Sequence, residues 1–106
     1  MIRCYRGIAE GHIYYQEALR GIARPRGGSA TPAQHNEGIT DSDLTSWTID
    51  YLVARRKALE SDSDGRGVIL QKDFEESELV SSPDTYGELE VFIRGIVIGA
   101  LVQRVP

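Results

Sequence analysis

Two glutamates separated by one residue, Glu88 and Glu90, have the types and spacing that most suggest chemistry in this chain. They lie where a polar stretch passes into the apolar run Val91–Ile93, a pattern that predicts the start of a strand. Residues i and i+2 of an extended segment share one face, so we expect both carboxylates to point the same way. Paired carboxylates occur in acid–base and cation-stabilising sites. A solvated strand edge is the plain alternative.

Two hydroxyl side chains, those of Ser46 and Thr48, lie on either side of Trp47 in the β-prone segment 44–48. The alternation predicts a strand that places Ser46 and Thr48 on one face and Trp47 on the other. A hydroxyl in a strand is usually an ordinary polar side chain. No histidine is placed by the sequence to act as a base for Ser46, so a hydrolytic triad is speculative.

Metal and thiol chemistry find little support in the sequence. The stretch 60–71 begins like a calcium-binding loop, but it ends in Gln71, where a bidentate glutamate is needed. The two histidines, His12 and His35, have no cluster of cysteines or aspartates at ligand spacing beside them. We therefore predict no metal site. The one cysteine, Cys4, lies in an apolar strand and is expected to be a small buried side chain.

The composition bounds the classes of function. A chain of 106 residues is expected to form a single domain, residues 1–106, with a core that needs no disulfide. No apolar run reaches the roughly 18 residues that a membrane span requires. The net charge of −4 gives no general attraction for nucleic acid, so a phosphate-bearing ligand would depend on local arginines such as Arg24 and Arg26. The start of the chain lacks the features of a signal peptide. We expect folding and activity in the cytoplasm, or delivery to a target cell by a route without a signal peptide.

The candidate residues must be positioned by a small set of helices and strands. Apolar periodicity predicts helices over residues 10–22 and 51–59, the second with Asp50 as its N-cap. Its inner stripe is expected to comprise Tyr51, Ala54 and Ala58, with Leu52 and Leu59. Strands are predicted over 2–7, 44–48, 68–70, 88–93 and 96–102, and a long loop over 24–43. This order predicts an α+β domain with a mixed or antiparallel sheet. The absence of a Gly-x-Gly-x-x-Gly motif excludes dinucleotide binding of the Rossmann kind.

Three features of the chain occur together, in the same order, in one family. The chain resembles ADP-ribosyltransferases of the cholera-toxin-like, Arg-Ser-Glu class. Tyr5-Arg6-Gly7 matches the arginine that ends the first strand, segment 44–48 matches the aromatic-x-Ser-Thr-Ser strand, and Glu88-Leu89-Glu90 matches the Glu-x-Glu pair. The departures are Leu44, Trp47 and Thr48, which replace an aromatic residue, a threonine and a serine. The resemblance covers nearly the whole chain and implies a compact ADP-ribosyltransferase-like fold, with a split sheet and two helices.

The resemblance also implies NAD as a substrate and a role for each site residue. Glu90 is expected to bind the ribose 2′-hydroxyl and to stabilise the positive charge that develops as nicotinamide leaves. Ser46 is expected to orient Glu90 and contact NAD, and Arg6 to hold a phosphate or ribose. Glu88 is expected to position or deprotonate the acceptor, which is arginine in family members with Glu-x-Glu. The residues expected to bind NAD are Arg6, Tyr5, Ser46, Thr48 and Trp47, with core packing as the alternative for Trp47.

The sequence thus predicts an NAD-dependent ADP-ribosyltransferase that modifies a protein side chain. The resemblance is to the compact toxin domains of bacterial polymorphic and contact-dependent systems, which implies a cognate immunity protein as a further partner. One alternative keeps the fold but makes the reaction NAD hydrolysis, or ADP-ribosylation of nucleic acid, which the acidic pI of about 5.1 disfavours. An alternative from another class is a non-catalytic module that binds a nucleotide or a protein.

Overall fold

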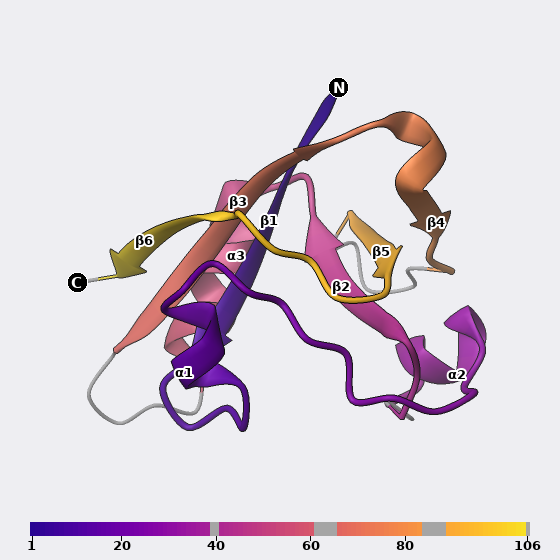
Figure 1. The fold of residues 1–106 in the computed structure, drawn as a ribbon, viewed down its shortest axis with the longest axis horizontal. Coiled ribbons are helices and arrows are strands. Elements are labelled where there is room, and N and C mark those ends of the chain that lie inside the picture. The colour runs from indigo at the N-terminus through magenta and orange to yellow at the C-terminus, as the bar shows by residue number, and fades with distance from the viewer. Residues whose placement is uncertain (39–40, 61–65, 84–88, 106) are drawn as a thin grey trace.

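The computed structural model describes residues 1–38, 41–60, 66–83 and 89–105. Within these residues one antiparallel sheet of six strands forms, in the order β4-β5-β2-β1-β3-β6 (Figure 1). This arrangement confirms the predicted α+β class. The strands are β1 (Ile2–Ala9), β2 (Leu44–Thr48), β3 (Gly67–Phe74), β4 (Leu79–Ser81), β5 (Glu90–Arg94) and β6 (Leu101–Val105).

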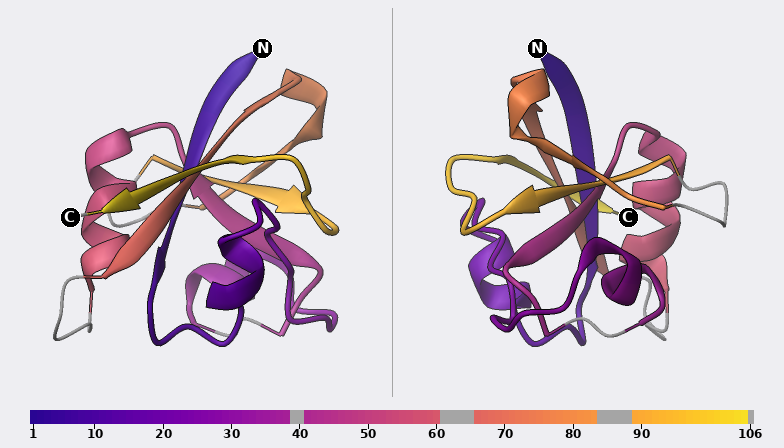
Figure 2. Two further views of the ribbon diagram at one scale, coloured as in Figure 1. Left: turned by 60° about the vertical axis from the view of Figure 1, so that its left-hand side comes forward. Right: turned by 90° about the vertical axis from the view of Figure 1, so that its right-hand side faces the viewer.

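Three α-helices are found in the described part of the chain, one more than predicted: α1 (Tyr15–Ala18), α2 (Pro32–Asn36) and α3 (Tyr51–Leu59), with a 3₁₀ turn over Glu76–Glu78. Helix α3 packs on one face of β1 and β3, while α1 lies on the other side of the sheet (Figure 2). None of the helices among the described residues has the length and apolar character that a bilayer span requires.

The sheet consists of two parts, β1-β3-β6 and β4-β5-β2, which meet at a narrow junction and which we call the two ladders. In the first ladder β1 pairs with β3 along its whole length, and in the second β2 pairs with β5 along its whole length. Between the two ladders, β1 and β2 share a single register position, where Tyr5 lies opposite Thr48. Next to it, the Arg6 guanidinium Nη1 donates to the Ser46 carbonyl oxygen at 2.9 Å. A side chain therefore takes the place of a backbone hydrogen bond where β1 and β2 cease to pair.

Helix α3 has the predicted bounds, because its N-cap signal is strong. The Asp50 carboxylate accepts a hydrogen bond from the Leu52 N–H at 2.9 Å. The predicted inner stripe is partly wrong: Val53 is buried, while Leu52 is 70% exposed. The helix approaches β1 so closely that a Cβ atom on Gly7 would stand 1.9 Å from the Ala54 carbonyl oxygen. Because the alanine edge of the helix faces the strand, Val53 turns toward β2 and Leu52 toward solvent.

The helix predicted over residues 10–22 is wrong in extent, since α1 has only four residues. Before α1 the chain turns instead: the Ala9 carbonyl accepts from the His12 N–H, and His12 Nδ1 accepts from the Tyr14 N–H. After α1, Gly21 adopts a left-handed φ of 77°, which ends helical structure.

The predicted loop over residues 24–43 contains helix α2. Thr31 and Gln34 form a capping box, and Pro32 occupies the first turn, where its missing N–H costs nothing. The signal is short, and apolar periodicity, which predicts longer helices, does not reveal a helix of this length. Helix α2 proves to be important for the candidate site, because it carries His35.

The C-terminal strands differ from those predicted over 88–93 and 96–102. Strand β5 begins at Glu90, and β6 begins only at residue 101. Between them Gly95 and Gly99 have left-handed φ values of 81° and 75°, which interrupt extended structure. Strand β4 was not predicted. Cys4 is buried as expected, and burial raises the pKa of its thiol to about 11.

Candidate functional site

Arg6, Ser46 and Glu90 line one pocket between helix α3 and strands β1, β2 and β5. The pocket has a volume of about 180 Å³, and we call it the carboxylate pocket. Glu88 lies outside the described residues, as do residues 61–65 of the calcium-loop-like stretch 60–71. The pocket thus includes every described residue of the predicted site in its lining, although the Trp47 side chain packs in the core. The lining comprises Tyr5, Arg6, Gly7, Ser46, Trp47, Thr48, Val53, Ala54, Lys57 and Glu90.

Strand register explains why the side chains of Tyr5, Ser46, Thr48 and Glu90 meet. Thr48 lies opposite Glu90 on β5 and opposite Tyr5 on β1, so the three share one face of the sheet. Ser46 precedes Thr48 by two residues and has the same orientation. The predicted alternation of β2 is therefore confirmed, and it places two hydroxyls beside one carboxylate.

Arg6 carries a buried hydrogen-bond donor for which the described residues supply no acceptor. While Nη1 donates to the Ser46 carbonyl, Nε is buried and has no partner among the described residues. Burial, reinforced by the positive charge of Arg26 and opposed by Glu90, lowers the pKa of Arg6 to about 10. The guanidinium therefore remains protonated at neutral pH. A buried, charged and incompletely paired guanidinium suits an anionic ligand.

Glu90 is held by Ser82, a residue that no motif in the sequence connects with the site. The Ser82 hydroxyl donates to Glu90 Oε1 at 2.6 Å. This contact crosses from the segment after β4 to the first residue of β5. It restricts the carboxylate rotamer and so helps to fix its direction within the pocket.

Leu89, the residue before Glu90, has a left-handed φ of 50°. Leucine pays a steric cost there, because its Cβ approaches the backbone, whereas glycine does not. Its side chain is 51% exposed and contributes little burial. The strained backbone of Leu89 thus determines the direction in which the chain enters β5 at Glu90.

The strain predicts an unusual order of stabilities. Leu89→Gly is expected to be more stable than Leu89→Val by about 1–2 kcal/mol, because a β-branched residue fits this conformation worst. At an ordinary exposed strand position valine is the more stable of the two. Urea denaturation of both variants measures the difference, and a more stable valine variant would contradict the left-handed assignment.

Trp47 serves the core. Its side chain is 1% exposed and packs edge-to-face against Phe74, with ring centroids 5.1 Å apart. The indole Nε1–H donates to Thr45 Oγ1 at 2.8 Å, which satisfies its polar group inside the protein. Packing is therefore the alternative that this geometry favours, and we leave Trp47 out of the proposed NAD-stacking contacts.

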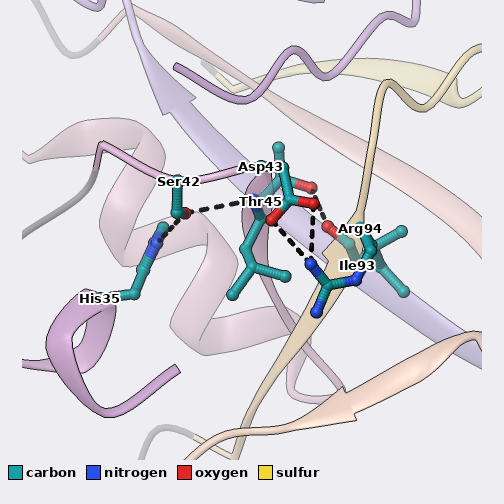
Figure 3. A network of polar contacts seen from close by, with 7 residues as sticks. His35, Ser42, Asp43, Thr45, Ile93 and Arg94 are labelled. Atoms are coloured by element: carbon teal, nitrogen blue, oxygen red, sulfur yellow. Dashed lines mark hydrogen bonds and ion pairs between the residues drawn. The ribbon is translucent and has the colours of Figure 1, made fainter. Parts of the chain in front are cut away.

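His35 is a second residue that joins the site without a motif in the sequence to connect it with Ser46. Helix α2 brings its ring next to β2, where Nε2 lies 3.1 Å from Ser46 Oγ and Nδ1 lies 2.8 Å from Ser42 Oγ. Figure 3 shows the ring directed from α2 toward Ser42. The ring also packs on Phe92 of β5, with centroids 4.7 Å apart. The contact between His35 and Ser46 depends on α2, and the capping box is the signal for α2 in the sequence.

The turn that presents Ser42 is fixed to the end of β5. Arg94 Nη1 donates to both carboxylate oxygens of Asp43, at 2.8 and 2.7 Å, as Figure 3 shows. The Asp43 carbonyl also accepts from the Gly95 N–H at 2.7 Å. Ser42 itself is fully buried. The turn that carries Ser42 is therefore held to the end of β5 by one side-chain contact and one backbone contact.

A second pocket, of about 160 Å³, meets the carboxylate pocket at Arg6 and Ser46. We call it the basic pocket. Arg24 is paired with Glu17 through two hydrogen bonds of 2.7 and 2.8 Å. Burial lowers the pKa of Arg6, His12 and His35, and the positive charge of Arg26 adds to that effect. No acidic residue is among its described lining. The lining comprises Arg6, His12, Tyr14, Arg24, Pro25, Arg26, His35, Leu44, Thr45 and Ser46.

The described residues contain no group of three or more histidine, cysteine, aspartate or glutamate side chains that could hold a metal ion. The described lining of the carboxylate pocket includes the Glu90 carboxylate, the hydroxyls of Tyr5, Ser46 and Thr48, and the cations Arg6 and Lys57. Comparisons of the chain with protein-family models, with curated proteins and with solved structures found no match.

Proposed function

We propose that this protein cleaves NAD and transfers the ADP-ribose group to an acceptor. The observation that carries the proposal is the convergence of Arg6, Ser46 and Glu90 on one pocket, from three different strands. The resemblance in sequence to ADP-ribosyltransferases rests on the same three residues. Their meeting in space is what such a reaction requires of them.

The proposed reaction breaks the bond between the nicotinamide nitrogen and C1′ of the ribose. Nicotinamide leaves with the bonding electron pair, the acceptor nucleophile forms a new bond to C1′, and the acceptor loses its proton. Positive charge develops on the ribose as nicotinamide leaves. A carboxylate fixed beforehand in a partly buried site stabilises that charge, and Glu90, restrained by Ser82, is suited to this role.

The two adjoining pockets suit an extended, anionic ligand. The reacting ribose belongs beside Glu90 in the carboxylate pocket. The phosphates belong at Arg6, whose Nε needs an acceptor, and toward the basic pocket, where Arg26 adds positive charge. Tyr5 and Thr48 complete the wall around the ribose. In this way a chain with net charge −4 presents a locally positive site to a dinucleotide.

The acceptor is proposed to be a protein side chain, with arginine as the candidate implied by the Glu-x-Glu pattern. The role of Glu88 toward this acceptor stays a prediction, as do a toxin or effector role in bacteria, a cognate immunity protein and delivery to a target cell. NAD hydrolysis is the second candidate function. It is favoured by the same pocket with water in place of the acceptor.

The proposal is tested by incubating the purified protein with NAD that carries separate labels on nicotinamide and on adenosine. We expect release of nicotinamide and, with a cell lysate, transfer of the adenosine label to protein. Release without transfer would identify an NAD hydrolase. Binding of NAD without release, with protein, nucleic acid and water supplied as acceptors, would identify a non-catalytic module. Glu76→Gln, which alters an exposed carboxylate outside both pockets, is the matched control.

A further inference from the structure

We propose that His35 sets the direction of hydrogen bonding at Ser46, so that Ser46 donates its proton into the carboxylate pocket and does not act as a nucleophile. His35 is then a positioning residue that acts through Ser46. The hydrogen-bond direction follows from the network itself. Its consequence for catalysis rests on the proposed function.

The direction is set at Ser42, which is fully buried. Its Oγ lies 3.1 Å from the Leu44 backbone nitrogen, and a backbone N–H can only donate. Ser42 Oγ therefore accepts this bond. Its own proton needs an acceptor, and the only one that it reaches among the described residues is His35 Nδ1, at 2.8 Å. Figure 3 shows both contacts converging on the Ser42 hydroxyl.

A proton donated by Ser42 requires His35 Nδ1 to be unprotonated. The neutral ring then carries its proton on Nε2, and Nε2–H donates to Ser46 Oγ at 3.1 Å. The opposite tautomer would direct Nδ1–H at Ser42 and leave the Ser42 proton buried without an acceptor among the described groups. Such an unsatisfied donor is unfavourable. The network thus assigns the tautomer.

The surroundings of His35 also oppose a doubly protonated ring. Burial lowers the pKa of His35; the Glu90 carboxylate on β5 opposes this, and the charges of Arg6 on β1 and Arg26 in the segment before α2 reinforce it. An imidazolium would also leave the Ser42 proton without its acceptor. The neutral Nε2–H form therefore satisfies every polar group that contacts the ring.

The assigned direction changes what the His35–Ser46 pair can do. In a serine hydrolase the histidine nitrogen next to the serine accepts the serine proton. Here that nitrogen donates, so it cannot remove the proton of Ser46. The Ser46 hydroxyl instead keeps its proton for an acceptor in the pocket, such as the Glu90 carboxylate or a ribose oxygen. Ser46 and Glu90 can then act as a hydrogen-bonded pair on one ligand.

The tautomer is measured directly by NMR. In ¹⁵N-labelled protein at about pH 7.5, where an ordinary histidine is mostly neutral, long-range ¹H–¹⁵N spectra separate protonated from unprotonated ring nitrogens. The variant His12→Gln leaves His35 as the one remaining histidine. We expect a protonated Nε2 and an unprotonated Nδ1. A protonated Nδ1 with an unprotonated Nε2, or a doubly protonated ring, would overturn the proposal.

Ser42→Ala provides the matched perturbation. It removes the donor to Nδ1 while leaving the ring contact with Phe92 in place. We expect the Nδ1 signal to change and a fraction of the opposite tautomer to appear. An unchanged tautomer in Ser42→Ala, with the fold intact by ¹H–¹⁵N spectra, would show that Ser42 does not set the direction.

The catalytic consequence is tested with two substitutions of His35. His35→Gln keeps an N–H donor near the position of Nε2, whereas His35→Leu removes it. We expect His35→Leu to lower kcat for nicotinamide release by about tenfold, and His35→Gln to recover most of it. Equal loss in both variants would reduce His35 to a packing role. A fluorophosphonate probe is expected to leave Ser46 unlabelled, and Ser46-dependent labelling would show an activated nucleophile.

These measurements separate this inference from the proposed function. If the protein releases no nicotinamide, the function fails, but the NMR tautomer still decides the direction at Ser46. If nicotinamide is released and the opposite tautomer is found, the function stands and the role of His35 falls.

Discussion

Replacing Glu90 with glutamine is expected to lower kcat for nicotinamide release from NAD by about 10²–10³-fold. The substitution removes the negative charge but keeps the shape of the side chain and an oxygen that can accept from Ser82. Loss of one preorganised electrostatic contact to a developing charge has an effect of this size. Since the contact matters most as charge develops, KM for NAD should change much less than kcat. Steady-state kinetics with NAD measure both constants.

The structure also supplies the controls for Glu90→Gln. Ser82→Ala removes the hydroxyl that holds Glu90 Oε1 and should give a smaller loss, because the charge remains. Glu76→Gln should behave as wild type. If Glu90→Gln kept more than about one third of the wild-type kcat, the charge-stabilising role would be wrong, whatever the acceptor.

The largest effect on stability is expected from Gly7→Ala. The added Cβ atom would stand 1.9 Å from the Ala54 carbonyl oxygen and 2.8 Å from the Ala58 nitrogen, both in the backbone of α3. A backbone contact cannot be relieved by a change of rotamer, so α3 must move away from β1. We expect a loss of about 3 kcal/mol in the free energy of unfolding, at the upper end for overpacked sites. Urea denaturation measures it.

Gly11→Ala is the matched control, because no described heavy atom beyond the two neighbouring residues lies within 4 Å of the position of its added Cβ. It should change the free energy of unfolding by about 0.5 kcal/mol or less. Gly67→Ala should resemble Gly7→Ala, since its Cβ would stand 2.0 Å from the Ala58 carbonyl oxygen. A Gly7→Ala protein as stable as Gly11→Ala would show that α3 does not approach β1 so closely. Gly7 also lines the carboxylate pocket, so displacement of α3 should impair the site as well.

Local signals were sufficient to predict the elements that define the core of the site. Strand β2 and helix α3 have the predicted bounds, because the first is β-prone at every position and the second begins at a capping aspartate. The alternation within β2 correctly separated Ser46 and Thr48 from Trp47. These predictions needed only residue types and the period of a strand.

What could not be predicted depends on contacts between distant residues. Leu52 had a place in the apolar pattern of α3, but Gly7 lets the alanine edge of the helix approach β1 and so turns Leu52 to solvent. His35 looked like a loop residue, yet α2 places it against Ser46. Ser82 had no feature that connected it to Glu90. Each outcome follows from tertiary packing, which no local period contains.

The single register position between β1 and β2 has a consequence for how a ligand is admitted. Arg6 fastens the two ladders through the Ser46 carbonyl, and the same guanidinium is the cation that faces both pockets. An anion that binds Arg6 shares the group that holds the ladders together. An anion that draws the Arg6 guanidinium away from the Ser46 carbonyl would couple ligand affinity to the separation of the ladders, each changing the other by the same free energy. The candidate binding site of this small domain thus lies at the junction between its two ladders.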